Sequence, residues 1–169
     1  EELERCHKAG ARIIAYPEPD YPKLLREIAS PPPVLTVLGD PQFLNKRSVA
    51  MVGARNASVN GCKFAQHIAA GLAEKGVVVI SGLAKGIDAF AHRGSLKYGT
   101  VGVIAGGIDH IYPKENRELY ALIPKNGAIV AELPIGTVPV GRNFPQRNRI
   151  ISGIALGTLV IEASQGSGS

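Results

Sequence analysis

A basic segment with one aromatic ring is the part of the sequence best suited to bind a polyanion. Residues 136–161 contain no acid and three arginines, Arg142, Arg147 and Arg149. Phe144 interrupts this polar run at the predicted start of a helix, which we expect Asn143 to cap. Arginines that contact phosphates beside a ring that stacks on a base favour single-stranded nucleic acid. The alternative places Phe144 in the core and makes Arg147 an ion-pair partner of Glu132 or Glu162.

Two glycine-containing loops earlier in the chain are also suited to anions. Arg55 follows Gly53 by two residues at the end of an apolar run, where a guanidinium can bind a phosphate. The segment 81–86 contains Ser81, Gly82 and Lys85 before a predicted helix. Ser81 either contacts a phosphate or only satisfies the turn, and the sequence does not decide between them.

Other polar residues are predicted to have structural roles. Asp88 and His92 stand four residues apart, but two ligands without a third make a poor metal site, so we expect Asp88 to offset a helix dipole. Neither a dinucleotide fingerprint nor a Gly-Lys-Ser/Thr phosphate loop is present. Four acids near strand ends could serve a hydrolase, but local pairing is the more common role; they are Asp88, Asp109, Glu132 and Glu162. We therefore expect no catalysis, no metal and no cofactor.

Short apolar runs recur from residue 48 onward and define the elements that hold these loops. They are four or five residues long, rich in Val and Ile, and do not alternate strictly, which indicates strands buried on both faces. Their ranges are 48–52, 77–80, 101–105, 128–131 and 158–161. Helical patterns lie between them, at 61–75, 86–98, around 119–123, and 143–156. This alternation predicts an α/β fold with a doubly wound, mainly parallel, Rossmann-like sheet.

Two details of these elements are specific enough to check. Phe64, Ile68 and Leu72 define the expected buried face of the helix at 61–75. Residues 1–47 contain seven of the twelve prolines and at most two short strands, at 12–15 and 34–38. We expect these residues to be a small N-terminal extension packed on the edge of the sheet.

Composition narrows the class of protein. The 169 residues are 45% apolar and 20% charged, which excludes a disordered chain. No uncharged apolar run is long enough to cross a membrane, and two cysteines are too few for a disulfide framework. A cytoplasmic location is therefore the default expectation. The net charge of +5 is compatible with a nucleic-acid partner but does not by itself establish one.

Six motifs in the same order and at the same spacing resemble the DNA-processing protein DprA (Smf) family. The resemblance extends from about residue 16 to residue 169, and Tyr21-Pro22 and Pro32-Pro33-Val34-Leu35 match the family's N-terminal extension. The motifs are Val52-Gly53-Ala54-Arg55; Ser81-Gly82-Leu83-Ala84-Lys85-Gly86-Ile87-Asp88; Gly106-Gly107-Ile108-Asp109 with Tyr112-Pro113; Glu132-Leu133-Pro134; Phe144-Pro145 with Arg147-Asn148-Arg149; and Val160-Ile161-Glu162-Ala163 with Ser167-Gly168-Ser169.

The resemblance implies a non-catalytic protein of natural transformation that binds single-stranded DNA, protects the incoming strand and assists loading of the recombinase RecA. It also implies a homodimer and a basic pocket containing Arg55, Lys114, Arg147 and Arg149, with Phe144 beside them and Lys85 as a further member. The loops add the remaining expected phosphate-binding residues, Gly53, Ser81, Gly82, Asn143, Asn148 and Ser167. Residues 48–169 would form a Rossmann-like domain that is truncated on its C-terminal side, because the family continues through a further helix and more sheet.

Two other functions remain open for the same loops. One is an enzyme of the related nucleotide-fold group that cleaves nucleoside monophosphates at the N-glycosidic bond. Those enzymes carry a Pro-Gly-Gly-x-Gly-Thr stretch, whereas this chain has Ala105-Gly106-Gly107-Ile108-Asp109. The other is a sensor of small nucleotides. Base release would support the enzyme, and mononucleotides that outcompete oligonucleotides would support the sensor.

Overall fold

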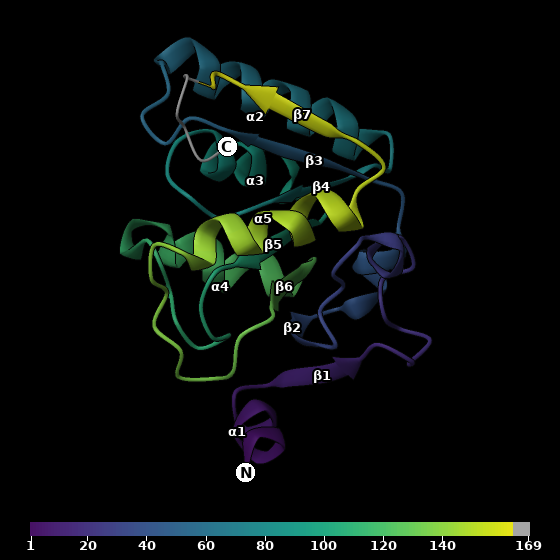
Figure 1. Cartoon of the computed structure of the whole chain (residues 1–169). Coiled ribbons are helices and arrows are strands. Elements are labelled where there is room, and N and C mark those ends of the chain that lie inside the picture. Colours follow the sequence, from purple (N-terminus) through teal and green to yellow (C-terminus); the bar gives the residue numbers. More distant parts are fainter. Residues whose placement is uncertain (164–169) are drawn as a thin grey trace.

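One twisted sheet organises the protein (Figure 1), and the computed structural model describes residues 1–163. Within these residues the sheet has seven strands in the order β1-β2-β6-β5-β4-β3-β7. The five strands β6, β5, β4, β3 and β7 are parallel to one another. Beyond β6, strand β2 pairs antiparallel with β6, and β1 pairs antiparallel with β2. The strands are β1 (Ala11–Ala15), β2 (Val34–Gly39), β3 (Ser48–Gly53), β4 (Val78–Ser81), β5 (Thr100–Ile104), β6 (Ala128–Ala131) and β7 (Thr158–Ile161).

Helices cover both faces of this sheet. The helix α5 (Asn143–Ile154) packs on one face together with the 3₁₀ segments η1 (Leu24–Glu27) and η2 (Pro41–Asn45). The opposite face carries α2 (Val59–Glu74), α3 (Ile87–Ser95) and α4 (Arg117–Leu122), with α1 (Glu2–Lys8) beside β1. Two further 3₁₀ segments, η3 (Lys114–Asn116) and η4 (Ile123–Lys125), flank α4.

Alternate residues of each central strand serve alternate faces, because successive side chains of a strand point in opposite directions. Ala50 and Ile80 join the core under α5, whereas Met51 and Val79 join the core under α2 and α3. All four are fully buried. Burial on both faces explains why these strands read as continuous apolar runs, and the predicted doubly wound, mainly parallel α/β class is confirmed.

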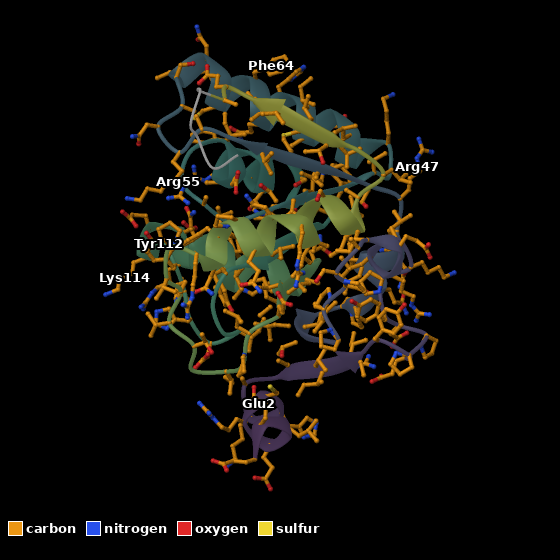
Figure 2. The ribbon with its side chains drawn as sticks, in the orientation of Figure 1. Glu2, Arg47, Arg55, Phe64, Tyr112 and Lys114 are labelled. Carbon is orange, nitrogen blue, oxygen red and sulfur yellow. The ribbon has the colours of Figure 1, made fainter. Side chains whose placement is uncertain are left out.

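The predicted buried face of α2 is correct only in part: Ile68 and Leu72 are half-buried and pack against the core under α2 and α3, whereas Phe64 does not. The buried residues of α2 are mainly small, namely Gly61, Cys62, Ala65, Ala69 and Ala73, and Phe64 is 53% exposed. The small residues let α3 approach α2 closely: a Cβ at Gly94 would lie 2.2 Å from the carbonyl oxygen of Gln66. A large apolar side chain has no room between the two helices, so Phe64 points outward (Figure 2).

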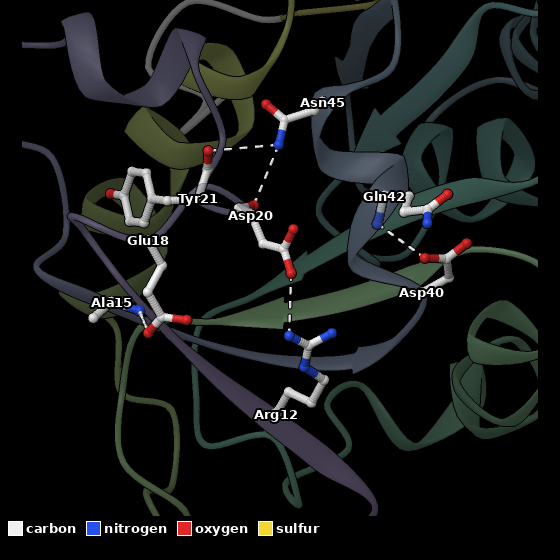
Figure 3. Close-up of polar contacts among 8 residues, drawn as sticks. All are labelled: Arg12, Ala15, Glu18, Asp20, Tyr21, Asp40, Gln42 and Asn45. Carbon is white, nitrogen blue, oxygen red and sulfur yellow. Dashed lines mark hydrogen bonds and ion pairs between the residues drawn. The ribbon is translucent and has the colours of Figure 1, made fainter.

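The first 47 residues are integrated into the sheet and its core. β2 pairs with β6, and Tyr21 and Leu25 are buried in the same cluster as Val101 and Val130. Figure 3 shows how the connecting segment is fastened: the side-chain amide of Asn45 donates to the carbonyl oxygens of Asp20 and Tyr21. The short helix α1 is an element that the sequence analysis did not predict.

None of the helices formed by residues 1–163 combines the length and apolar character needed to cross a membrane.

Candidate nucleic-acid interface

A groove lies where the order of the parallel strands reverses. The chain adds β4, β5 and β6 in turn on one side of β3, and α5 then returns over the opposite face so that β7 pairs on the other side of β3. In open α/β sheets ligands bind at such a switch point, beyond the carboxyl ends of the strands. The groove here has a volume of about 1320 Å³ and is lined by the ends of β3 and β7 and by the first turns of α5.

Three side chains from three separate segments of the chain meet over this groove. Arg55 follows β3, Tyr112 follows β5, and Phe144 is in the first turn of α5. The Arg55 guanidinium lies 5.1 Å from the centroid of the Phe144 ring, and the Tyr112 and Phe144 centroids are 5.5 Å apart with the rings tilted by 55°. Arg55 and Tyr112 are exposed and Phe144 is half-buried. The cluster thus presents a cation and aromatic surface together, which suits a phosphate with its base.

Two lysines extend the positive charge along the same side of the molecule. Lys114 is exposed in η3, two residues after Tyr112, and Figure 2 shows it beside Tyr112 and on the same side as Arg55. Lys85 is also exposed, but its ammonium group forms an ion pair with Glu115 that raises the pKa of Lys85. Of these two lysines, Lys114 is the one without an ion pair to the described residues.

The loop after β4 is held by side chains that do not reach solvent. The Asp88 carboxylate accepts hydrogen bonds from the backbone N–H groups of Gly82, at 3.0 Å, and Ala84, at 3.3 Å. The Asn116 amide donates to the carbonyl oxygens of Leu83 and Ala84. Leu83 has a φ of 54°, in the left-handed region, so these contacts maintain a backbone conformation that a leucine rarely adopts.

Gly86 brings this loop against the loop that carries Arg55. Its φ is 72°, and a Cβ there would lie 2.3 Å from the Ala54 carbonyl oxygen and 2.6 Å from that of Arg55. The next amide, of Ile87, donates to the same Ala54 oxygen. Only glycine allows both the conformation and the contact, so the position of Arg55 depends on Gly86.

Arg147 lies under the groove, where the sequence analysis expected a phosphate contact. Only 6% of its surface is exposed, and its guanidinium donates to the carbonyl oxygens of Gly82 and Val103. Burial lowers the pKa of Arg147, and the charge of Asp88 acts in the opposite direction. Burial likewise raises the pKa of Asp88, opposed by Arg147 and by the two N–H donors. The arginine therefore ties α5 to the ends of β4 and β5.

The ion pair considered for Arg147 is formed by Arg149 instead. The Arg149 guanidinium pairs with Glu132 at the end of β6, and both side chains are mostly buried. Glu162 accepts hydrogen bonds from the backbone and hydroxyl groups of Ser58, which lowers its pKa. The alternative pairing of Arg147 with Glu132 or Glu162 is thus wrong. The helical spacing of Arg147 and Arg149 places them on different sides of α5, and the sequence alone does not tell which of them faces Glu132.

Several other expected site residues contribute to the architecture rather than to the exposed surface. Ser81 is fully buried and its hydroxyl donates to the Met51 carbonyl oxygen, which favours the structural interpretation over a phosphate contact. A Cβ at Gly53 would lie 1.9 Å from the Ile161 carbonyl oxygen, and one at Gly82 would lie 2.6 Å from the Arg147 guanidinium. These two glycines make room for β7 and for Arg147.

The remaining expected residues lie at the start of α5 or beyond the described chain. Asn143 is the first residue of the helix rather than its cap, and its side-chain oxygen accepts a hydrogen bond from the Val140 N–H at 2.8 Å. Asn148 lines the groove and accepts a hydrogen bond from the Arg147 Nε. Ser167 lies outside residues 1–163.

The possible catalytic groups are engaged in local contacts. His92 is fully buried. Because the Thr100 hydroxyl donates its hydrogen to the Val79 carbonyl oxygen, it accepts a hydrogen bond from the Nδ1–H of His92. Burial lowers the pKa of His92 to about 3, so the ring is neutral. The Asp109 carboxylate accepts from the Gly136 N–H. Residues 1–163 contain no group of three or more His, Cys, Asp or Glu side chains that could hold a metal ion.

Sequence reasoning missed two residues of the site. Tyr112 and His110 line a smaller, partly enclosed cavity of about 50 Å³ next to Phe144, together with Arg55 and Pro139. One feature of the sequence could have indicated Tyr112. It is an aromatic residue in a glycine-containing loop that follows a buried strand, a position at which a side chain does not pack into the core.

Comparison with known proteins identifies the family. A model of the family DNA recombination-mediator protein A matches residues 12–169. The chain belongs to this family. DNA processing protein DprA from Bacillus subtilis is 41% identical over 99% of this chain, and its namesake from Streptococcus pneumoniae is 41% identical over 88%. The chain spans about half of each relative, 57% and 53% respectively.

Solved structures of DNA processing protein A have the same fold. The X-ray structure of DprA from Streptococcus pneumoniae superimposes with a TM-score of 0.89 and 38% sequence identity. The match covers 94% of this chain and 56% of the Streptococcus pneumoniae chain. The structure of DNA processing protein A from Helicobacter pylori superimposes with a TM-score of 0.87 and 27% sequence identity. The match covers 94% of this chain and 72% of the Helicobacter pylori chain. That protein is described for its unique single-stranded DNA binding mode.

Proposed function

We propose that this chain binds single-stranded DNA, independently of sequence, in the groove at the carboxyl ends of the parallel strands. The observation that carries the proposal is the cluster of Arg55, Phe144 and Tyr112, in which an exposed cation lies against an aromatic pair at the switch point of the sheet. The Helicobacter pylori relative that shares the fold is described as binding single-stranded DNA.

Each residue of the groove has a distinct role in this proposal. Arg55 and Lys114 neutralise phosphates, because both are exposed and neither forms an ion pair with another described residue. Phe144 and Tyr112 stack on bases. Arg147 positions the loop after β4, and Arg149 holds α5 against β6, so these two arginines act through the shape of the groove rather than by contact with DNA.

Binding without catalysis is part of the proposal. The four carboxylates near the strand ends each accept hydrogen bonds or form an ion pair within the protein, as described above for Asp88, Asp109, Glu132 and Glu162. A carboxylate held in this way is poorly placed to accept a proton from a substrate. Incubation with nucleoside monophosphates, followed by chromatography of the released base, tests this point, and base release would favour the glycosidase instead.

Membership of the family supports a proposal for the wider role. In the whole protein we propose that the bound strand is protected and passed to RecA during natural transformation in the cytoplasm, and that the protein acts as a homodimer. Light scattering of the purified chain tests dimerisation. Protection of a labelled oligonucleotide from a single-strand nuclease, and the rate of RecA filament formation with and without the protein, test the other two roles.

Fluorescence anisotropy with a labelled oligo-dT is the decisive test of DNA binding. We expect tight binding that weakens with salt, with a slope of about −0.7 in the logarithm of affinity per phosphate neutralised. The matching duplex and a mononucleotide serve as competitors. Failure to bind oligo-dT at low salt would refute the proposal, and a mononucleotide that competes better than oligo-dT would favour the nucleotide sensor.

A further inference from the structure

The opposite end of the sheet carries a second group of cations. Each of the four neighbouring parallel strands β6, β5, β4 and β3 is preceded, within three residues, by at least one lysine or arginine. We call these exposed residues the amino-end row; they are Lys125, Lys97, Lys75, Lys46 and Arg47. Because parallel strands begin at the same edge of a sheet and lie about 4.8 Å apart, the row extends for about 15 Å.

Contacts between the connecting segments show that the row is continuous. The Asn126 side chain, beside Lys125, donates to the carbonyl oxygen of Lys97 at 2.7 Å. The carbonyl oxygen of Arg47 accepts from the N–H of Val78 at the start of β4. The ammonium group of Lys46 lies 3.5 Å from the centroid of the Phe43 ring. A Cβ at Gly99, which precedes β5, would meet that same ring.

Within residues 1–163, the cations of the row outnumber the carboxylates around them. The segments 40–47, 74–77, 97–99 and 125–127 hold five cations and two carboxylates, Asp40 and Glu74. Among residues 1–163, no ion pair involves any of the five cations. Negative partial charges at helix C-termini favour lysine after α2, α3 and η4, but that effect is confined to the last turn. Lys46 is likewise the C-cap of the 3₁₀ segment η2, so the effect accounts for the four lysines but not for Arg47, which lies one residue further on.

An aromatic ring lies within the row. Tyr98 is 45% exposed, and the ammonium group of Lys97 is 5.1 Å from the centroid of its ring. A tyrosine beside a lysine repeats, at this end of the sheet, the combination that Arg55 and Phe144 form at the other end. Regularly spaced cations around an exposed ring fit the sugar-phosphate backbone and bases of a single strand better than they fit a protein surface, because phosphates recur along the strand.

We propose that the amino-end row is a second contact site for single-stranded DNA, used by a strand that leaves the groove and continues around the molecule. The inference rests on the proposed binding of single-stranded DNA in the groove. Figure 2 shows Arg47 on the side of the molecule away from Arg55, Tyr112 and Lys114. Strands of four to six residues separate the two ends by about 13 to 20 Å. A short oligonucleotide therefore fills only the groove, and a long one reaches both sites.

The test compares two variants with two oligonucleotides. Arg47→Gln with Lys97→Gln removes two charges from the row, and Arg5→Gln with Lys63→Gln removes two exposed charges that neither line the groove nor lie within three residues of the start of a strand. Affinities are measured for oligo-dT of about 4 and about 40 nucleotides. We expect the row variant to bind the long oligonucleotide about tenfold more weakly, with a salt slope smaller by about 1.4 for two phosphates, and to bind the short one normally. The control variant should match the unmodified chain.

Two results would overturn the inference while leaving the groove intact. One is equal binding of the long oligonucleotide by the row variant and the control variant, with normal thermal melting of both. The other comes from photocrosslinking with a long 5-iododeoxyuridine oligonucleotide, in which crosslinked peptides that contain Tyr112 or Phe144 but never Tyr98 would exclude the row. Absence of binding to both oligonucleotides by the unmodified chain would instead refute the proposed function.

Discussion

Replacing Arg147 by methionine tests whether this arginine supports the groove or contacts DNA. The substitution removes a buried guanidinium that donates to Gly82 and Val103 and leaves the buried carboxylate of Asp88 without its nearby positive charge. Removing one member of a buried charge pair costs about 3 to 5 kcal/mol. For a chain of this size that corresponds to a fall in melting temperature of about 6 to 20 °C.

The pH dependence of this effect identifies Asp88 as its cause. Without Arg147 the pKa of Asp88 rises further above its value in the unfolded chain, so the folded variant binds more protons than the unfolded variant. The contribution of Asp88 to the stability of Arg147→Met therefore increases as the pH falls, and the deficit of this variant relative to the unmodified chain is largest near pH 8 and smaller near pH 5. Adding Asp88→Asn should restore part of the lost stability at pH 8.

Urea unfolding of the variants, followed by circular dichroism, measures these differences. Arg142→Met is the matched control, because Arg142 is exposed just before α5 and its loss should change the free energy of unfolding by less than about 0.5 kcal/mol. The reasoning is refuted if Arg147→Met unfolds at the same urea concentration as the control and yet loses DNA binding. That result would make Arg147 a direct phosphate contact.

Three further predictions concern single side chains. Arg55→Glu should weaken oligo-dT binding at least tenfold with little change in melting temperature, because the side chain is exposed; anisotropy and a thermal melt check both, and unchanged affinity would remove Arg55 from the site. Phe144→Ala should cost about 1 to 3 kcal/mol of binding for the base that it stacks, and collapse of the fold in a thermal melt would assign the ring to the core instead. His92 has a pKa of about 3 in the folded chain and about 6.5 in the unfolded chain, so its contribution makes stability fall as the pH drops below about 6.5, by up to about 1.4 kcal/mol per pH unit. His92→Gln should flatten that dependence in urea titrations, and an unaltered slope would contradict the buried, neutral ring.

The parallel part of the fold was predictable because its strands are buried on both faces. Continuous runs of Val and Ile have few alternatives to such a strand, and the observed bounds of β3 to β7 differ from the expected ones by no more than one residue at each end. The buried face of helix α2 was harder to predict. That face consists of alanine, cysteine and glycine, which carry little hydrophobic signal, so the larger side chain of Phe64 dominated the pattern.

The candidate site was predictable at the level of loops and less so at the level of side chains. We could place Arg55 and Phe144 at the groove from two sequence features. These are the glycines and arginines around them and their positions after predicted strands. The sequence does not encode which arginine of α5 turns inward, because that depends on where the ends of β4, β5 and β6 lie relative to the helix. Arg147 reaches the carbonyl oxygens of Gly82 and Val103, whereas Arg149 reaches Glu132.

The pairing of β3 with β7 has a consequence for the order of folding. Ala50 in β3 pairs with Ile80 on one side, but on the other side it pairs with Thr158, more than a hundred residues later. Closing so long a segment is slow, because its entropy is lost before the contacts form. During synthesis one edge of β3 therefore stays unpaired until α5 and β7 have emerged. Arg55 stands at the end of that strand, so the groove takes shape only in the last steps of folding.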